Sequence, residues 1–347
     1  MPDLFDDARL DDQAALEAAD GVLRPLAEAG SRVRLETEAA SEAIAAGTAL
    51  AGREARPRAV VAAGPDSRLL RAVLEPWCPV PFVAWPGPSL PGWAGALDLV
   101  VVLAPDGGDS GAASAVAEAV RRGCRVVVAC PPGSLVAEHT VGRDSTLLPC
   151  SSGDQLATAD VVLQVLDRLD LGPDSDPESV AQALDDVAIA CSPYRDQSVN
   201  PAKGLAIALA DATPLVWGGS VLAARAARRI AESLRRSSGR TALAGDAEHL
   251  LPVIRAAAPA DLFADPFNDA SDGGDGERPP PVLVVLDDGA EGATIREQRA
   301  RLAAAADDQH VRVETVSSEA VTDVARYAAL LTTGTYAAAY LGIGLGR

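Results

Sequence analysis

Aromatic residues are scarce in this chain, because Phe, Trp and Tyr make up only 3% of its 347 residues. Alanine, valine and leucine supply most of the 48% hydrophobic content instead. This balance argues against an all-β sandwich and favours buried parallel strands covered by alanine-rich helices. The length and the apolar content are sufficient for two ordinary hydrophobic cores, so we expect two domains.

Cysteine and histidine are also few, with five and three residues, and no CxxC pair or histidine at metal-ligand spacing occurs. We therefore expect reduced, mostly buried thiols and no metal site. No predicted strand is followed by GxGxxG, which argues against a nucleotide-binding dehydrogenase. The sequence thus predicts no cofactor.

Positive charge is in deficit, since 49 acidic residues outnumber 30 basic ones and the net charge is −19. Repulsion then disfavours bare nucleic acid and anionic membranes as partners. No basic start followed by an apolar run marks a signal peptide, and no apolar stretch reaches the length of a membrane span. We expect a cytoplasmic protein.

The apolar runs of the first half alternate with helix-compatible segments, after two predicted helices at residues 12–29 and 36–51. The predicted strands are Arg58–Ala63, Val80–Ala84, Leu97–Leu103, Arg125–Cys130 and Thr146–Leu148. Five strands alternating with helices predict a doubly wound parallel sheet of an α/β domain. The turn at Gly172 ends this pattern, and a connecting helix is expected over Pro177–Ala190.

The second half repeats the plan before a long final helix over Thr322–Leu341. Its predicted strands are Pro214–Trp217, Thr241–Ala244, Val282–Leu286 and Val311–Thr315. Between the second and third of these strands, residues 261–281 are rich in Asp, Gly and Pro. We interpret this segment as an acidic surface loop, with a lid or a partner-docking role as the alternative.

One stretch is more specific than these patterns. Asn200-Pro201-Ala202-Lys203 opens an Ala/Leu helix, Trp217-Gly218-Gly219-Ser220 follows a short apolar run, and Arg225 precedes Glu232 by two helical turns. These motifs resemble the second half of the bacterial and archaeal phosphoglucose/phosphomannose isomerases, which carry two sugar isomerase (SIS) domains. The resemblance implies two tandem SIS domains, each a doubly wound parallel sheet in an αβα arrangement, after an N-terminal helical segment. The limits are 1–35 for that segment, 36–172 for the first SIS domain and 173–347 for the second.

The resemblance also implies a homodimer and a sugar derivative or sugar phosphate as ligand. In the family a Ser/Thr-rich turn after a strand binds the phosphate, and here that turn is Ala104-Pro105-Asp106-Gly107-Gly108-Asp109 before Ser110. The first glycine-rich turn is Gly64-Pro65-Asp66-Ser67. The implied ligand residues are Gly64, Ser67, Gly107 and Ser110, and the alternative for both serines is helix capping.

Carboxylates take the place of hydroxyls in these turns. A carboxylate 4 Å from a phosphate oxygen costs roughly 4 kcal/mol at an effective dielectric constant near 20. We therefore expect Asp66, Asp106 and Asp109 to weaken phosphate binding.

The catalytic positions match the family only in part. Aldose–ketose isomerisation needs a carboxylate base and an acid that opens the ring. Glu248 matches the family's base, with a solvated glutamate at a helix start as the alternative. The run 286–293 lacks the family's histidine, and the helix with the family's lysine is absent before the chain ends at Arg347.

Four further residues carry the resemblance, and each has a structural alternative. Asn200 and Lys203 are implied ligand residues, or Asn200 is a helix cap. Arg225 and Glu232 are implied ligand residues, or an ion pair on one helix face. Two functions remain open: an SIS protein that binds a carbohydrate derivative with lost or weak catalysis, and an active sugar-phosphate isomerase that uses Glu248 as its base.

Overall fold

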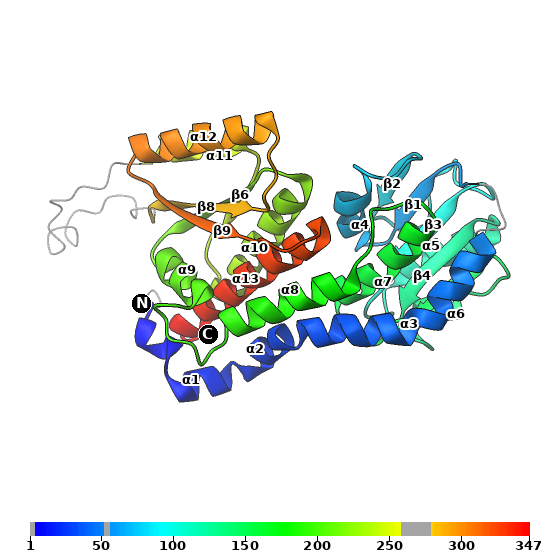
Figure 1. Ribbon diagram of the computed structural model, residues 1–347, viewed down its shortest axis with the longest axis horizontal. Coiled ribbons are helices and arrows are strands. Elements are labelled where there is room, and N and C mark those ends of the chain that lie inside the picture. The colour runs from blue at the N-terminus through cyan, green and yellow to red at the C-terminus, as the bar shows by residue number, and fades with distance from the viewer. Residues whose placement is uncertain (1–3, 52–55, 258–278) are drawn as a thin grey trace, which may run out of the picture. The chain divides into compact units, whose positions relative to one another are not determined.

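All paired strands run parallel, in one five-stranded and one four-stranded sheet, within the residues that the computed structural model describes, 4–51, 56–257 and 279–347 (Figure 1). The chain divides into two compact units. One comprises residues 28–185, and the other combines residues 1–27 with 186–347. We call them the 28–185 unit and the composite unit. The division falls inside helix α8 (Pro177–Ala190), and the predicted domain limits remain a prediction.

The sheet of the 28–185 unit has the strand order β2-β1-β3-β4-β5. The strands are β1 (Val60–Ala63), β2 (Phe82–Trp85), β3 (Leu99–Leu103), β4 (Arg125–Cys130) and β5 (Ser145–Pro149). The two central strands β1 and β3 are buried along their whole length. This explains why they appear in the sequence as continuous apolar runs without alternation.

Helices cover both faces of this sheet. They are α3 (Ala29–Ala51), α4 (Ser67–Leu74), α5 (Ser110–Arg121), α6 (Leu135–Glu138) and α7 (Gln155–Arg168). Helices α5 and α6 share one core with alternate residues of β1, β3 and β4. Helix α7 packs against β3, β4 and α3. The result is the three-layer arrangement that the α/β pattern predicts.

The composite unit repeats this plan with the strand order β7-β6-β8-β9. Its strands are β6 (Thr213–Gly218), β7 (Leu243–Ala244), β8 (Pro281–Asp287) and β9 (Arg312–Ser317). Helices α11 (Ala247–Arg255) and α12 (Ala293–Asp308) form a core with one face of β6 and β8. Helix α10 (Val221–Ser238) packs on β6 and β8 and against α13 (Asp323–Gly344), which also contacts α9 (Pro201–Leu209).

The N-terminal residues complete the composite unit. The short turn η1 (Asp7–Leu10) and helix α2 (Asp20–Ala27) contact α13, and α1 (Gln13–Ala18) lies between them in the chain. The single helix predicted over 12–29 is therefore two helices with a break at Ala19. The helix predicted from Glu36 begins seven residues earlier, at Ala29.

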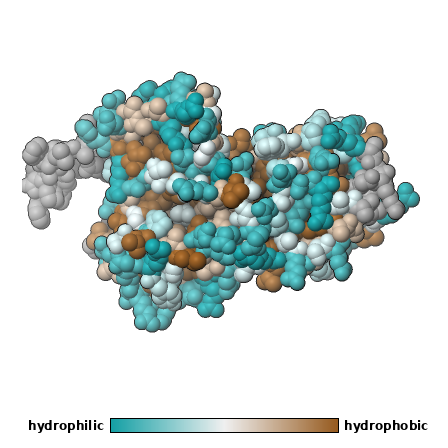
Figure 2. Space-filling view, in the orientation of Figure 1, coloured by the Kyte–Doolittle hydropathy of each residue, from teal (hydrophilic) through white to brown (hydrophobic). Residues whose placement is uncertain are grey.

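The predicted α/β class is confirmed, and each predicted strand overlaps an observed one. The acidic segment 261–281 lies outside the described residues up to position 278. All five cysteines are free thiols, and four of them are buried. Within the described part of the chain, none of the helices combines the length and the hydrophobicity that crossing a bilayer requires. In Figure 2, hydrophobic side chains reach the visible surface in small groups among hydrophilic ones.

Candidate functional site

The carboxyl ends of β1 and β3 form a topological switch point. The chain leaves β1 through α4 toward β2 at one edge, and leaves β3 through α5 toward β4 on the other side. In open α/β sheets, ligands bind in the crevice at such a point. Both turns here begin with a glycine of positive φ soon after the strand, Gly64 at 90° and Gly107 at 67°. A Cβ added to Gly64 would lie 3.5 Å from the Cβ of Ala112 in α5, so the first turn packs against the helix that follows the second.

Ser67 lies where the turn after β1 meets helix α4, at this switch point. It is the first residue of α4, its side chain is 1% exposed, and its hydroxyl has no hydrogen-bond partner among the described residues. Asp66 holds the N-cap position without capping through its side chain, and accepts a hydrogen bond from the Gln155 amide of α7. The capping alternative for Ser67 is therefore wrong. A buried hydroxyl without a partner costs about 1–3 kcal/mol, which a ligand can recover.

The second turn is built differently. The Asp109 carboxylate caps α5 by accepting a hydrogen bond of 2.6 Å from the Ala112 amide. Ser110 follows as an exposed helical residue, so it is not the cap either. A Cβ on Gly107 would overlap Ser134 at the start of α6, which explains why glycine is needed there. One first-turn amide of α5 is thus already bound by the protein's own carboxylate.

A third polar turn, after β5, is filled by a residue that sequence reasoning missed. Glu36 of α3 is almost fully buried, and its carboxylate accepts hydrogen bonds from the amides of Ser151, at 2.8 Å, and Ser152. Asp154 caps the following helix α7 and pairs with Arg32 at 2.8 Å. The amides of this turn have a geometry that binds anions, and the Glu36 carboxylate already occupies that position.

The second sheet has its own topological switch point, between β6 and β8, and the side chains of Ser220 and Asp288 are hydrogen-bonded to each other there. Ser220 caps α10 through the Ala223 amide, 3.0 Å away, and donates a hydrogen bond to Asp288. The neighbouring Asp287 pairs with Arg299 at 2.7 Å, which lowers the pKa of the Asp287 carboxyl. The residues that stand where the family has its histidine are therefore held in internal contacts.

Glu248 lies in the first turn of α11 on the surface. Its carboxylate pairs with Arg301 of α12 at 2.7 Å, and the hydrogen bond from this guanidinium lowers the pKa of Glu248. A lowered pKa weakens a carboxylate as a proton acceptor. Glu248 therefore belongs to the composite unit, whereas the turns at Ser67 and Gly107 belong to the 28–185 unit, and it lies in an exposed ion pair.

Asn200 and Lys203 have buried structural contacts. Asn200 caps α9 by accepting hydrogen bonds from the amides of Ala202 and Lys203, at 3.0 and 3.1 Å. The Lys203 side chain is 0% exposed, and its ammonium donates to Asp11, to the Pro193 carbonyl and to the Arg195 carbonyl at 2.7–2.9 Å. All three ammonium protons are used. The cap that the sequence offered as an alternative is present.

Arg225 and Glu232 lie on α10 beside Tyr327 of α13. The Glu232 carboxylate pairs with Arg229 at 3.0 Å. Burial raises the pKa of the Tyr327 hydroxyl, and the nearby Arg225 side chain opposes this shift. These residues form a polar group at the α10–α13 packing surface.

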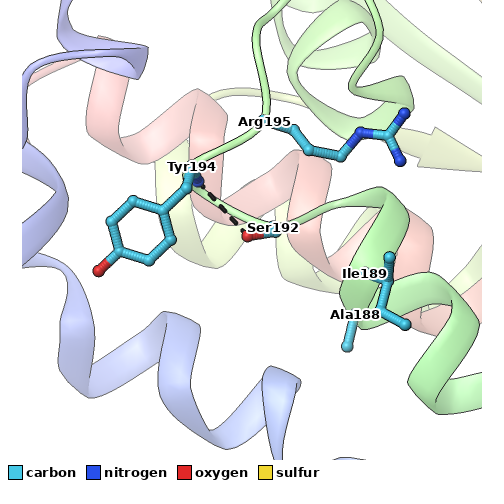
Figure 3. Close-up of a pocket in the computed structure, with 5 residues that line it drawn as sticks. All are labelled: Ala188, Ile189, Ser192, Tyr194 and Arg195. Atoms are coloured by element: carbon cyan, nitrogen blue, oxygen red, sulfur yellow. Dashed lines mark hydrogen bonds between the residues drawn. The ribbon is translucent and has the colours of Figure 1, made fainter.

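Two hollows open on the composite unit, and Tyr194 lines both. The smaller, of about 540 Å³, is bounded by Ala188, Ile189, Ser192 and Arg195 (Figure 3). The larger, of about 880 Å³, lies between the loop before α9 and helices α1 and α2. Its lining comprises Asp11, Gln13, Leu16, Glu17, Asp20, Leu23, Arg24, Pro193, Tyr194 and Asp196. Nothing in the local sequence around Tyr194 predicted the larger hollow, because residues 11–24 and 193–196 form it together.

No cluster of His, Cys, Asp and Glu with metal-binding geometry occurs among residues 4–51, 56–257 and 279–347.

Comparison with known proteins gives one family match, and no curated protein matches the chain. Residues 198–347 match the model of the bacterial phospho-glucose isomerase C-terminal SIS domain. This segment begins two residues before Asn200 and contains most of the composite unit.

Solved structures resemble almost the whole chain. Tagatose-6-phosphate ketose/aldose isomerase from Escherichia coli is 14% identical, with 95% of this chain and 94% of that chain covered and a TM-score of 0.65. The C-terminal domain of glucosamine-fructose-6-phosphate aminotransferase from Francisella tularensis is 11% identical, with 91% and 95% covered and a TM-score of 0.59.

A glucose-6-phosphate isomerase like protein from Thermus thermophilus is 19% identical, with 84% and 82% covered and a TM-score of 0.51. At these identities the likeness concerns the fold. Residues 198–347 therefore resemble the C-terminal SIS domain of the bacterial phosphoglucose isomerases, and the chain shares its fold with these phosphosugar isomerase structures.

Proposed function

We propose that this protein binds a carbohydrate derivative of the sugar-phosphate type at the β1–β3 switch point, with weak or lost isomerase activity. The observation that carries the proposal is the Ser67 hydroxyl, which is buried at this switch point and has no partner among the described residues. A sugar hydroxyl or a phosphate oxygen supplies the hydrogen bond that the protein leaves unmade. Gly64, Gly107 and Ser110 complete the proposed site.

Weak catalysis follows from the positions of the acidic groups. Asp109 occupies the first-turn amide of α5, and Asp106 is exposed in the same turn. Glu248 keeps its charge through Arg301, which opposes proton uptake. Each of these contacts disfavours either phosphate binding or base catalysis.

The alternative is an active aldose–ketose isomerase with Glu248 as base. It is supported by the names of the similar structures, among them an isomerase of tagatose 6-phosphate. A coupled assay with fructose 6-phosphate decides between the two. Turnover on the order of 10 per second would establish the isomerase, and its loss in Glu248→Gln would identify the base.

A homodimer belongs to the same proposal, because the resemblance implies it, and a cytoplasmic location follows from the sequence features given above. The apolar segment Tyr336–Leu341 of α13 does not offer a dimer face. Tyr336, Tyr340 and Leu341 are buried within the composite unit, where α13 packs against α9 and α10. Light scattering of the purified chain measures the oligomeric state directly.

Calorimetry with glucose 6-phosphate, fructose 6-phosphate and the unphosphorylated sugars tests the binding site. We expect Ser67→Ala to weaken binding of the preferred sugar at least about five-fold, since one buried hydrogen bond is worth roughly 1 kcal/mol. Thermal stability should stay equal or rise, because the substitution removes an unpaired hydroxyl. Ser110→Ala, at an exposed position, is the matched control. Equal binding by wild type and Ser67→Ala would contradict the proposed site.

A further inference from the structure

The loop from Ser192 to Val199 is held from beneath by buried side chains. The Tyr340 hydroxyl donates to the Cys191 carbonyl at 2.6 Å, and the Asn200 amide donates to the Ser192 carbonyl at 3.0 Å. Lys203 binds two further carbonyls of the loop, Pro193 and Arg195. Four carbonyls at the start of this loop are therefore bonded to buried side chains of the protein interior.

This fixed loop presents an aromatic side chain to solvent. Tyr194 is 89% exposed, although its amide and its neighbours are anchored. Figure 3 shows the ring directed away from the loop toward the N-terminal helices, with Arg195 directed to the other side. Single exposed apolar residues are common, but this one forms a wall shared by both hollows. A preorganised tyrosine is a low-cost anchor for a partner, because little conformational entropy is lost on binding.

The charged side chains that line the larger hollow are mostly acidic, so they favour a positively charged partner. Four carboxylates line it, and Arg24 is the basic residue among the described lining. Asp11 is paired with Lys203 and Asp20 with Arg24, at 2.7 and 2.6 Å. Glu17 and Asp196 instead meet neutral donors, the Gln13 amide and the Ser198 hydroxyl. These two carboxylates, which line the same hollow as Tyr194, therefore accept hydrogen bonds from neutral groups and leave that hollow acidic.

Hydrogen bonds fix the ionisation of one of them. The Ser198 hydroxyl, with the Ser198 amide, lowers the pKa of Asp196, so this carboxylate stays charged in neutral and mildly acidic solution. Leu16 and Leu23 also line the hollow but are buried, so the exposed Tyr194 ring offers its apolar contact. The hollow therefore suits a cation with a planar body that stacks on an aromatic ring.

We propose that Tyr194, Glu17 and Asp196 form a docking site for an arginine-bearing segment of a partner protein. A guanidinium stacks on an aromatic face and binds carboxylates at the same time, which matches this combination of side chains. A second copy of this chain is disfavoured as occupant, because two copies carry −19 each and would bring two acidic hollows together. The proposal does not depend on sugar binding, since every residue of the docking site lies in the composite unit.

The test uses the full chain and a fluorescein-labelled peptide of six alternating arginine and leucine residues. Fluorescence anisotropy should show saturable binding that weakens between about 50 and 300 mM salt. Tyr194→Ala should weaken binding about ten-fold, and Tyr194→Phe less than about three-fold, because the stacking ring remains. Glu17→Gln should weaken binding and flatten its salt dependence, without touching the Asp196 turn.

Matched controls separate docking from general attraction to an acidic protein. Val321→Ala changes another exposed apolar residue of the same unit and should bind as wild type. Circular dichroism verifies that each variant is folded. Equal affinity of Tyr194→Ala and wild type would overturn the proposal, as would equal binding of a glutamate–leucine peptide. Displacement of the peptide by spermidine at equal affinity would assign the hollow to small cations, and a dimer that dissociates in Tyr194→Ala would assign it to a second copy; either result rejects the partner segment.

Discussion

Tyr336 and Tyr340 stack on successive turns of α13, with ring centroids 6.3 Å apart and an interplanar angle of 24°, yet their hydroxyl groups are in opposite situations. The Tyr340 hydroxyl donates to the Cys191 carbonyl at 2.6 Å. The Tyr336 hydroxyl is buried and has no hydrogen-bond partner within the described residues. Burial raises the pKa of both phenols, so both remain protonated in neutral solution.

This contrast predicts opposite effects of one substitution. Tyr336→Phe should leave the free energy of unfolding unchanged or raise it by about 1 kcal/mol, because it removes an unpaired buried hydroxyl. Tyr340→Phe should lower it by about 1–2 kcal/mol, because it leaves the Cys191 carbonyl without this donor. Urea denaturation of both variants gives the comparison. Equal loss of stability in the two variants would show that the Tyr336 hydroxyl is bonded in solution.

Three glycines near the second turn allow backbone strain and steric overlap to be separated. Gly107 has a positive φ, and an added Cβ would lie 2.6 Å from Ser134 Oγ. Gly133 has a positive φ of 75° with open space around it, and Gly108 combines open space with an ordinary φ. Alanine at position 107 should destabilise the protein by about 2–4 kcal/mol, at 133 by about 1–2 kcal/mol, and at 108 by less than about 0.5 kcal/mol.

Thermal and urea unfolding measure this series. A loss at position 133 as large as that at 107 would mean that the left-handed backbone alone explains the glycine in the β3 turn. Similar small losses at all three positions would mean that the turn relaxes around the new methyl group.

Asp160 in α7 predicts a pH dependence of stability. Burial raises the pKa of this carboxyl from 3.8 to about 7, although the Gln164 amide donates to it at 3.2 Å. The folded protein therefore holds a proton that the unfolded chain releases near pH 4. The contribution to the free energy of unfolding is full below about pH 4, and is lost progressively as the pH rises from 4 to 7.

Asp160→Asn removes this dependence, because the amide resembles the neutral acid. The variant should be more stable than wild type at pH 8, by an amount on the order of 1–4 kcal/mol, and similar to it at pH 4. Urea midpoints measured from pH 4 to 8 provide the test. A midpoint difference that does not change with pH would contradict a raised pKa at this position.

The acidic turn after β3 predicts a gain of function. Asp106→Ser with Asp109→Thr removes two charges, and threonine retains the capping hydroxyl for α5. A tenth of the roughly 4 kcal/mol unscreened repulsion at each site corresponds to an affinity gain of about four-fold for glucose 6-phosphate at low salt. Calorimetry measures this gain. Asp170→Asn with Asp174→Asn removes the same charge at two exposed positions of the same unit and should give no comparable change.

Local patterns predicted the fold well for identifiable reasons. The strands Arg125–Cys130 and Leu99–Leu103 are buried runs of branched residues bounded by turns, and such runs have few other structures available. The cap at Asn200 depends on residues two and three positions later, so it too could be found from sequence. The glycines at positions 64 and 107 are likewise local signals, because glycine is the residue that most easily adopts a positive φ.

The contacts that define the sites are not local. Lys203 meets Asp11 across 192 positions, and Glu36 reaches Ser151 across 115 positions. Ser220 binds Asp288, which lies 68 positions further along the chain. Periodicity carries no information about such pairs. The cap at Asp109 is different, because its carboxylate binds the Ala112 amide only three positions later. An aspartate just before an alanine-rich helix is itself a capping signal, so local sequence could have assigned the cap to Asp109 rather than to Ser110.

The composite unit is built from two segments that are distant in the sequence, and this has a consequence for its synthesis on the ribosome. Residues 28–185 form a continuous unit that can fold as soon as they emerge. The first helices, however, pack against α13, the last helix of the chain. They therefore cannot make these contacts until residues 323–344 have been translated. Losing the first 27 residues would remove the Asp11 carboxylate from Lys203 and leave its buried ammonium without this ionic partner. The N-terminal segment therefore completes a domain whose other residues, 186–347, are translated later.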